Sequence, residues 1–216
     1  ARSTPGMRVL LDAARAAGVP VEDVERSALD AWAPDHQGVV AFATTPSPRT
    51  FGERDLATVP FTEDAVVVVL DGIEDPQNLG AVVRAAEAAG ASMVVTRTRR
   101  SAAITDAAVR ASAGALLHLP LARVANIPRA LDRLRDRGFT VVGLDGERGT
   151  SVFDEPAPPG PLALVLGSEG RGMSRLAKEH CDLLVALPMR GRVGSLNAAA
   201  ALAAALWSYV LPRRTG

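Results

Sequence analysis

Three polar segments of the chain carry side chains that could bind or act on a ligand. Each follows an apolar run typical of a strand and leads toward a helical pattern. The first segment holds Asn78 and Arg84, an amide and a guanidinium. The second is the glycine-rich stretch GSEGRG, and the third carries arginines followed by Ser195 and Asn197. Parallel α/β sheets bind ligands in loops beyond the carboxyl ends of their strands, so these segments form the candidate site.

The glycine-rich segment, LVLGSEGRGMSR, contains Gly167, Gly170 and Gly172 within six residues. Because glycine lacks a Cβ, such a loop lets the backbone approach a bound ligand closely. Its order, G-x-x-G-x-G, differs from the dinucleotide fingerprint G-x-G-x-x-G, and the segment lies late in the chain. The sequence also has no G-x-x-x-x-G-K-[ST] loop and no G-x-S-x-G elbow, which excludes a P-loop and argues against an α/β-hydrolase.

Each segment also has a purely structural interpretation, which the sequence leaves open. Asn78 lies near an expected helix start, where asparagine commonly caps free N–H groups. Ser195 could cap the last helix in the same way. A glycine-rich strand exit can be a tight turn without a ligand.

The elements that would position these segments alternate along the chain. Apolar runs predict strands over 65–72, 92–96, 116–124, 139–146, 161–170 and 182–189. Helical patterns fall between and after them, over 78–91, 106–115, 127–138 and 196–211. This alternation predicts an α/β fold with three layers around a parallel sheet.

The first part of the chain has a different pattern. A short helix is expected over 9–17, a further helical turn or two over 19–32, and a strand at Val39–Phe42. We interpret residues 1–43 as part of a small α/β domain whose beginning is missing, since this stretch makes a poor independent core. Residues 44–62 carry three prolines and read as a linker, so the main domain is expected over 63–216.

Composition narrows the class of protein. Apolar residues make up 48% of the 216 residues and charged residues 22%, as in a packed globular chain. Twenty-four basic residues balance 24 acidic ones, so any nucleic-acid contact must come from a local group of arginines. One cysteine, Cys181, and three histidines predict neither a disulfide nor a metal site. No apolar run reaches the ~20 residues of a membrane span, and the N-terminus is unlike a secretory signal, so a cytoplasmic protein is expected.

Together, the three segments closely resemble the SpoU branch of the SPOUT methyltransferases. NLGAVVRAA resembles the first motif of that family, LVLGSEGRGMSR its second and LPMRGRVGSLNAA its third. The resemblance covers Val66 to Tyr209. DHQGVVA is similar to the end of the L30e-like RNA-binding domain in the 23S ribosomal RNA guanosine 2′-O-methyltransferases, and RRSAAITDAAVRASAGALLHLPLARV is similar to that subgroup as well.

The resemblance implies a deep C-terminal trefoil knot, S-adenosylmethionine as cofactor, a homodimer, and methylation of a guanosine ribose in 23S ribosomal RNA. By motif position, the implied catalytic residues are Asn78, Arg84, Glu169, Ser195 and Asn197. The implied cofactor contacts are Gly167, Ser168, Glu169, Gly170, Leu187, Pro188, Met189, Ser195, Leu196 and Asn197. Arg84 could act as the base for the 2′-hydroxyl, or hold a phosphate and stabilise the alkoxide as a cation, since a guanidinium stays protonated.

Alternatives within the same fold remain. They are a transfer-RNA ribose methyltransferase, an antibiotic-resistance enzyme acting on another ribosomal nucleotide, and a catalytically silent RNA-binding homologue. The arginines expected to contact RNA are Arg97, Arg99, Arg100, Arg190 and Arg192. In the C-terminal helix, Trp207 and Tyr209 could contribute to a dimer interface. The alternative is that Leu202, Leu206 and Val210 simply cover the sheet.

Overall fold

The computed structural model describes residues 4–34, 36–42, 48–99 and 101–214. The chain divides into two compact units, Ala1–Pro46 and Ser47–Gly216, and each is described by itself. Arg100, one of the expected RNA contacts, lies outside the described residues.

The first unit contains two helices. Helix α1 spans Pro5–Ala16, and the Thr4 hydroxyl caps it by accepting a hydrogen bond from the amide of Met7. Helix α2 spans Arg26–Trp32. None of the residues of these two helices is buried. The strand expected at Val39–Phe42 is wrong, because these residues form no ladder; within this unit no described segment pairs with them, and a strand needs a hydrogen-bonded neighbour.

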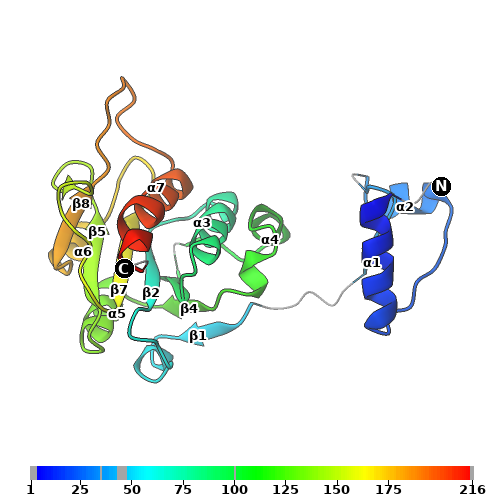
Figure 1. Cartoon of the computed structure of the whole chain (residues 1–216), viewed down its shortest axis with the longest axis horizontal. Helices are drawn as coiled ribbons and strands as arrows, with labels where there is room; N and C mark the ends of the chain where they lie inside the picture. Colours follow the sequence, from blue (N-terminus) through cyan, green and yellow to red (C-terminus); the bar gives the residue numbers. More distant parts are fainter. Residues whose placement is uncertain (1–3, 35, 43–47, 100, 215–216) are drawn as a thin grey trace. The chain divides into compact units, whose positions relative to one another are not determined.

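The second unit is built on one sheet whose strand pairs are all parallel, which confirms the expected parallel α/β architecture (Figure 1). The strands lie in the order β1-β4-β3-β2-β7-β5-β8-β6. Their bounds are Thr50–Gly52 (β1), Val66–Asp71 (β2), Met93–Arg97 (β3), Leu121–Val124 (β4), Thr140–Leu144 (β5), Thr150–Ser151 (β6), Leu162–Gly167 (β7) and Leu183–Ala186 (β8).

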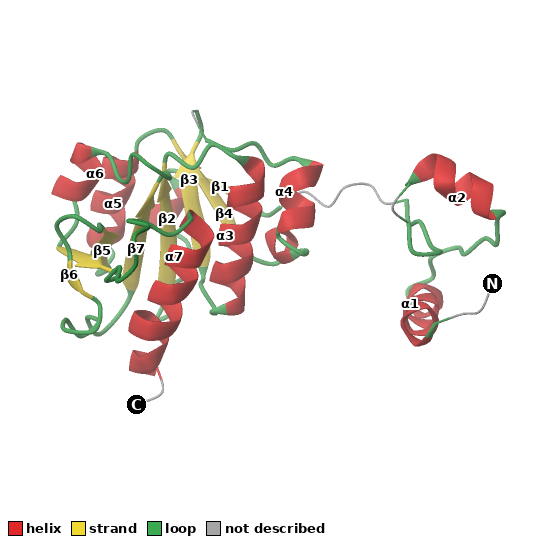
Figure 2. Cartoon of the chain, turned by 90° about the horizontal axis from the view of Figure 1, so that it is seen from above, coloured by secondary structure: helices red, strands yellow, loops and turns green. Residues whose placement is uncertain are grey.

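Helices cover both faces of this sheet, as Figure 2 shows, so the three-layer prediction is confirmed. Helices α3 and α7 pack on one face, and α5 and α6 on the other. The helices span Pro76–Ala88 (α3), Asp106–Ala111 (α4), Ile127–Arg135 (α5), Arg175–Glu179 (α6) and Ala198–Ala205 (α7). Helix α7 continues as a π-helical turn over Leu206–Val210. Within the described residues, no helix has the length and apolar character to cross a membrane.

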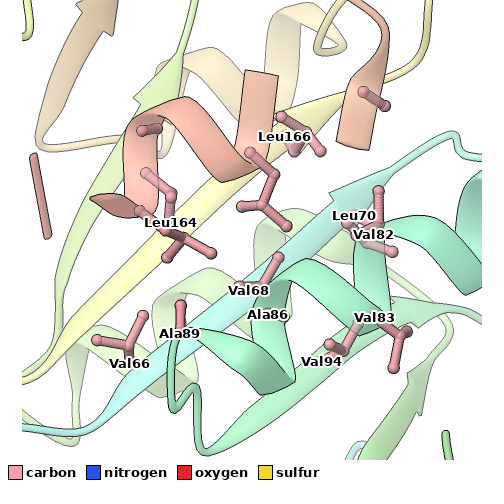
Figure 3. Close-up of a cluster of buried hydrophobic side chains, with 14 of the residues drawn as sticks. Val66, Val68, Leu70, Val82, Val83, Ala86, Ala89, Val94, Leu164 and Leu166 are labelled. Carbon is pink, nitrogen blue, oxygen red and sulfur yellow. The ribbon is translucent and has the colours of Figure 1, made fainter. Parts of the chain in front are cut away.

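Strand β2 forms the centre of the core, and all of its residues are buried. Val66, Val68 and Leu70 face the layer of α3 and α7 (Figure 3). Val67 and Val69 face the layer of α5 and α6. Because successive side chains of a strand point to opposite faces, a strand covered on both sides reads as a continuous apolar run.

The C-terminal helical segment covers the sheet, in agreement with one of its two interpretations. Its own side chains Leu202, Leu206 and Val210 are buried in the core. Tyr209 is also buried, so the expectation that its ring contributes to a dimer surface is wrong. Trp207 is 48% exposed and remains accessible on this segment.

The expected linker over 44–62 is incorrect from Thr50 onward. Residues Thr50–Gly52 form β1, which pairs with β4 at the sheet edge, and Asp55–Ala57 form a 3₁₀ turn that buries Leu56. These short elements carry no periodic apolar pattern, and they exist through long-range pairing. The two-residue strand β6 and the five-residue helix α6 are also absent from the sequence prediction.

Glu53 attaches this edge to the rest of the unit. Its side chain is only 12% exposed and accepts a hydrogen bond from the amide of Ala125 at 3.2 Å. It also pairs with Arg129, whose Nη2 lies 2.9 Å from Oε2, and with Arg133. The hydrogen bond from the Arg129 guanidinium lowers the pKa of the Glu53 carboxyl below its ordinary value of 4.5.

Replacing Glu53 by glutamine should therefore destabilise the fold in a pH-dependent way. The folded protein has the lower pKa, so the carboxylate stabilises it fully above pH 4.5 and loses that effect as the pH falls further. Urea unfolding at neutral pH should show that the free energy of unfolding of Glu53→Gln is about 1 kcal/mol lower than that of the wild type. The difference from the wild type should shrink on acidification below pH 4.5. The matched control is Glu179→Gln, because the half-exposed carboxylate of Glu179 also pairs with an arginine, Arg175. If the loss of unfolding free energy in Glu53→Gln persists at low pH, it does not come from the carboxylate charge.

Candidate active site

The structure joins all three polar segments through one carboxylate. The Nδ2 atom of Asn78, in the first turn of α3, donates a hydrogen bond to Oε1 of Glu169 at 3.3 Å. The same oxygen accepts a hydrogen bond from the backbone amide of Ala198, the first residue of α7, at 3.1 Å. Glu169 lies in the loop after β7. A single side chain thus holds the loops after β2, β7 and β8 together.

Asn78 is available for this contact because another residue caps its helix. Asp75 is the N-cap of α3, and its carboxylate accepts hydrogen bonds from the amides of Gln77 at 3.3 Å and Asn78 at 3.2 Å. Pro76 occupies the first helical position, where a missing N–H costs nothing. The interpretation of Asn78 as the cap is therefore wrong, and its side chain reaches across to the glycine-rich loop instead.

The glycine-rich loop folds back on itself. Ser168 and Gly172 exchange two backbone hydrogen bonds, of 3.2 and 2.8 Å. A Cβ on Gly167 would lie 2.0 Å from the carbonyl carbon of Gly172, so this glycine is required by the returning backbone. Gly170 and Gly172 have φ values of +78° and +64°, which L-residues with side chains rarely adopt. The loop is a tight turn, and the space beside Gly170 and Gly172 is open.

The third segment forms an open loop between β8 and α7. Leu187 is half-buried, whereas Pro188, Met189, Ser195 and Leu196 are exposed. Asn197 is the N-cap of α7, and its Oδ1 accepts a hydrogen bond from the amide of Ala200 at 2.7 Å. The alternative that Ser195 caps this helix is therefore wrong, and the capping role belongs to Asn197.

A shallow hollow of about 180 Å³ lies where the first two segments meet. Its lining residues are Gly72, Ile73, Glu74, Asn78, Ser168, Glu169 and Arg171. This volume is below the range of about 300–1,000 Å³ that is typical of pockets for small molecules. Arg84 is exposed on α3 and does not line the hollow. Ser195 also lies outside it. The hydrogen bonds of Glu169 unite Asn78 with the start of α7, and they include neither Arg84 nor Ser195.

A second carboxylate, which unlike Glu169 is buried, lies beside the glycine-rich loop. Asp71 ends β2 and is 3% exposed. Its Oδ2 accepts a hydrogen bond from the amide of Ser174 at 2.7 Å, and its Oδ1 pairs with Nη2 of Arg97 at 2.6 Å. Asp71, Asp75 and the amide of Ala198 are functional groups that the sequence pattern does not predict. The Asp-Pro pair in EDPQN could have identified the Asp75 cap, since proline favours the first position of a helix.

Neither a metal-ligating cluster nor an ionised thiol accompanies the site in the parts of the chain that the structure describes. No group of three or more His, Cys, Asp or Glu side chains is arranged to hold a metal ion there. Burial raises the pKa of the Cys181 thiol to about 12, so this sulfur stays protonated at neutral pH. A carboxylate, an amide side chain and a backbone N–H meet at the site, and such groups can bind and orient a ligand.

Comparison with known proteins agrees with these features. The model of the SpoU rRNA Methylase family matches residues 65–207. A 23S rRNA (guanosine-2'-O-)-methyltransferase from Pseudomonas putida is 41% identical over 216 residues, covering 99% of this chain and 86% of that protein. A putative TrmH family tRNA/rRNA methyltransferase from Bacillus subtilis is 40% identical and covers 95% of this chain and 82% of that protein.

A solved structure shares the fold as well. The SpoU methyltransferase AviRb from Streptomyces viridochromogenes, in complex with the cofactor AdoMet, superposes with a TM-score of 0.68. It is 33% identical in sequence, and the match covers 75% of this chain and 66% of AviRb. The family model spans the chain from β2 to α7, including all three segments that Glu169 joins. The chain belongs to the SpoU family of RNA methylases.

Proposed function

We propose that this protein transfers a methyl group from S-adenosylmethionine to the ribose 2′-hydroxyl of a guanosine in 23S ribosomal RNA. The observation that carries the proposal is the Glu169 carboxylate, which gathers the three SpoU segments at one sheet edge through Asn78 and the amide of Ala198. The 41% identity to the P. putida 23S rRNA methyltransferase, over nearly the whole chain, supports this choice of substrate.

The residues around the glycine-rich loop fit the proposed cofactor. Gly167, Ser168, Glu169 and Gly170 would hold it from one side, with open space beside Gly170. Leu187, Pro188, Met189, Ser195, Leu196 and Asn197 would hold it from the other. Met189 and Leu196 are 38% and 43% exposed, so apolar surface is free to cover an adenine. When bound, S-adenosylmethionine supplies an electrophilic methyl group on a sulfonium.

This chain's own residues would orient the ribose and manage its proton. In the proposed transfer, the 2′-oxygen would bond to the methyl carbon as the bond from sulfur to that carbon breaks. The sulfonium would become a neutral thioether, and the hydroxyl proton would pass to solvent. Asn78 and Glu169 would fix the loops so that the reacting atoms align, which supplies much of the acceleration. Arg84, an exposed cation on α3, would hold a phosphate and stabilise the developing alkoxide.

Three further features of the SpoU resemblance belong to this proposal: a trefoil knot, a homodimer and an L30e-like front domain. The strand order supports the knot, because β6 lies beyond β8 at the edge while β7 is inserted between β2 and β5. The exposed Trp207 supports a dimer surface on the C-terminal segment. For residues 1–43, the support is the alignment of 99% of this chain with the P. putida enzyme.

The RNA would approach through exposed arginines. Arg99 follows β3, and Arg190 and Arg192 lie in the loop after β8; all three are exposed. Arg97 differs from them, because its guanidinium is paired with the buried Asp71. We therefore assign phosphate contacts to Arg99, Arg190 and Arg192 and a different role to Arg97.

The function is tested by cofactor binding and by methyl transfer with the full chain. Calorimetry should detect binding of S-adenosylmethionine without RNA. With radiolabelled cofactor, 23S ribosomal RNA should gain a 2′-O-methyl group on a guanosine, and transfer RNA should gain none. Methylation of transfer RNA alone would favour the transfer-RNA alternative. Cofactor binding with no transfer to either RNA would favour the silent homologue.

Replacing Gly167 by alanine should damage the cofactor loop through the protein's own backbone. The added Cβ would overlap Gly172 and Met173, which should cost about 1–3 kcal/mol of stability and weaken cofactor binding about tenfold. Thermal unfolding and calorimetry measure the two effects. The control is Gly146→Ala, where a Cβ meets nothing within 4 Å; its stability should stay within about 0.5 kcal/mol of the wild type. Equal behaviour of the two variants would contradict the prediction.

Replacing Arg84 by alanine should leave cofactor binding intact and lower turnover by roughly 10²–10³-fold, as expected for the loss of a group that stabilises a developing oxyanion. The exposed side chain supports no packing, so stability should not change. Arg84→Lys keeps the charge but loses the planar fork. Rescue by lysine favours a simple cation, and failure of rescue favours bidentate positioning or proton abstraction. Wild-type turnover by Arg84→Ala would remove this residue from the mechanism.

A further inference from the structure

Strand β3 contributes no segment to the three SpoU motifs, yet its last residue reaches the glycine-rich loop through an ion pair with a buried carboxylate. Arg97 ends β3, and its Nη2 lies 2.6 Å from Oδ1 of Asp71. The other oxygen of the same carboxylate accepts the amide of Ser174, 2.7 Å away, at the end of the glycine-rich loop. Asp71 therefore connects the exit of β3 with the residue where that loop ends.

Burial makes this connection sensitive to the loss of either partner. The Asp71 side chain is 3% exposed, so its charge depends on Arg97 and on the Ser174 amide rather than on water. A buried charge that loses its partner is costly, because desolvation of the remaining group is no longer offset. We expect the removal of Arg97 to displace Asp71, and with it the Ser174 end of the loop.

Two further contacts connect the same elements. The amide of Ala102, beyond the β3 exit, donates to the carbonyl of Ile73 at 2.9 Å, and Ile73 lines the hollow with Asn78 and Glu169. At the start of the glycine-rich loop, Asp71 pairs with Gly167 in the parallel ladder of β2 and β7. The segment 71–73 thus contacts the glycine-rich loop near its start and at its end.

We propose that Asp71 and Arg97 are positioning residues for the cofactor loop, so that Arg97 sets the affinity for S-adenosylmethionine rather than contacting RNA. The proposal rests on the function proposed above. Asp71 holds the amide of Ser174, the N-cap of α6, and Arg97 holds Asp71 in the orientation that this amide requires.

The test compares Arg97→Met with Arg99→Met in the full chain. Arg97→Met should weaken binding of S-adenosylmethionine without RNA by about tenfold, as expected for a partner of a buried charge. Arg97→Lys keeps a charge beside Asp71 and should recover part of that affinity. Arg99→Met should bind the cofactor like the wild type and bind 23S ribosomal RNA more weakly. Unchanged cofactor affinity with weaker RNA binding in Arg97→Met would overturn the proposal and make Arg97 an RNA contact.

A control separates positioning from general loss of stability. Glu53 also accepts one backbone amide and pairs with arginine, but at the β1 edge of the sheet. Glu53→Gln should lower the unfolding temperature and leave cofactor affinity unchanged. If Glu53→Gln weakens cofactor binding as much as Arg97→Met does, the effect is one of global stability and the proposal fails.

A double variant tests whether the pair acts as a unit. In Asp71→Asn, the amide oxygen can still accept from Ser174, but its NH₂ group faces the Arg97 donors. Asp71→Asn/Arg97→Met removes that conflict. The fold-loss of cofactor affinity in the double variant should therefore be smaller than the product of the two single fold-losses. If the two single fold-losses of cofactor affinity simply multiply in the double variant, Asp71 and Arg97 do not act as a unit. If the wild-type protein itself binds no S-adenosylmethionine, the proposed function fails, whereas normal wild-type binding with unaffected variants rejects only this inference.

Discussion

The in-register pairing of β2 with β7 is the constraint on which the site depends. Asp71, the last residue of β2, lies opposite Gly167, the last residue of β7. Because the strands are parallel, the first SpoU segment and the glycine-rich loop begin side by side at their carboxyl ends. Both strands are almost wholly buried between two helical layers, so a shift of register would expose core residues and separate the two loops.

Three carboxylates at the carboxyl ends of these strands hold the loops and α6 in place through hydrogen bonds and ion pairs. Glu169 joins the loops to α7, and Asp71 holds the start of α6. Asp145 follows β5, on the other side of β7, and pairs with Lys178 of α6 at 2.6 Å. Burial alone would raise the pKa of Asp145, but the Lys178 ammonium and the amide of Glu147 hold it below the usual range. Helix α6 is therefore attached on both sides of the strand from which the glycine-rich loop emerges.

At the carboxyl ends of the strands, some loop segments are held by contacts and others are exposed. The loop ends near Gly167 and Ser174 are fixed by backbone contacts, whereas Met189, Val193 and Leu196 are left exposed in the segment before α7. Such a division suits a cofactor site, because one wall is preformed and the other presents apolar surface that a ligand can cover.

The sequence by itself determined the parallel α/β architecture, the family and the three segments that meet at the site. Continuous apolar runs such as 66–70 predict buried strands, and motif order identifies the loops between them. Only the tertiary structure decided that Asp75 caps α3, that Asn197 caps α7, that β1 forms in the expected linker, and that Arg97 pairs with Asp71. Periodicity records which face of an element is buried, but it does not record which distant residue supplies the hydrogen bond, and each of the last two features depends on a partner at least 26 residues away.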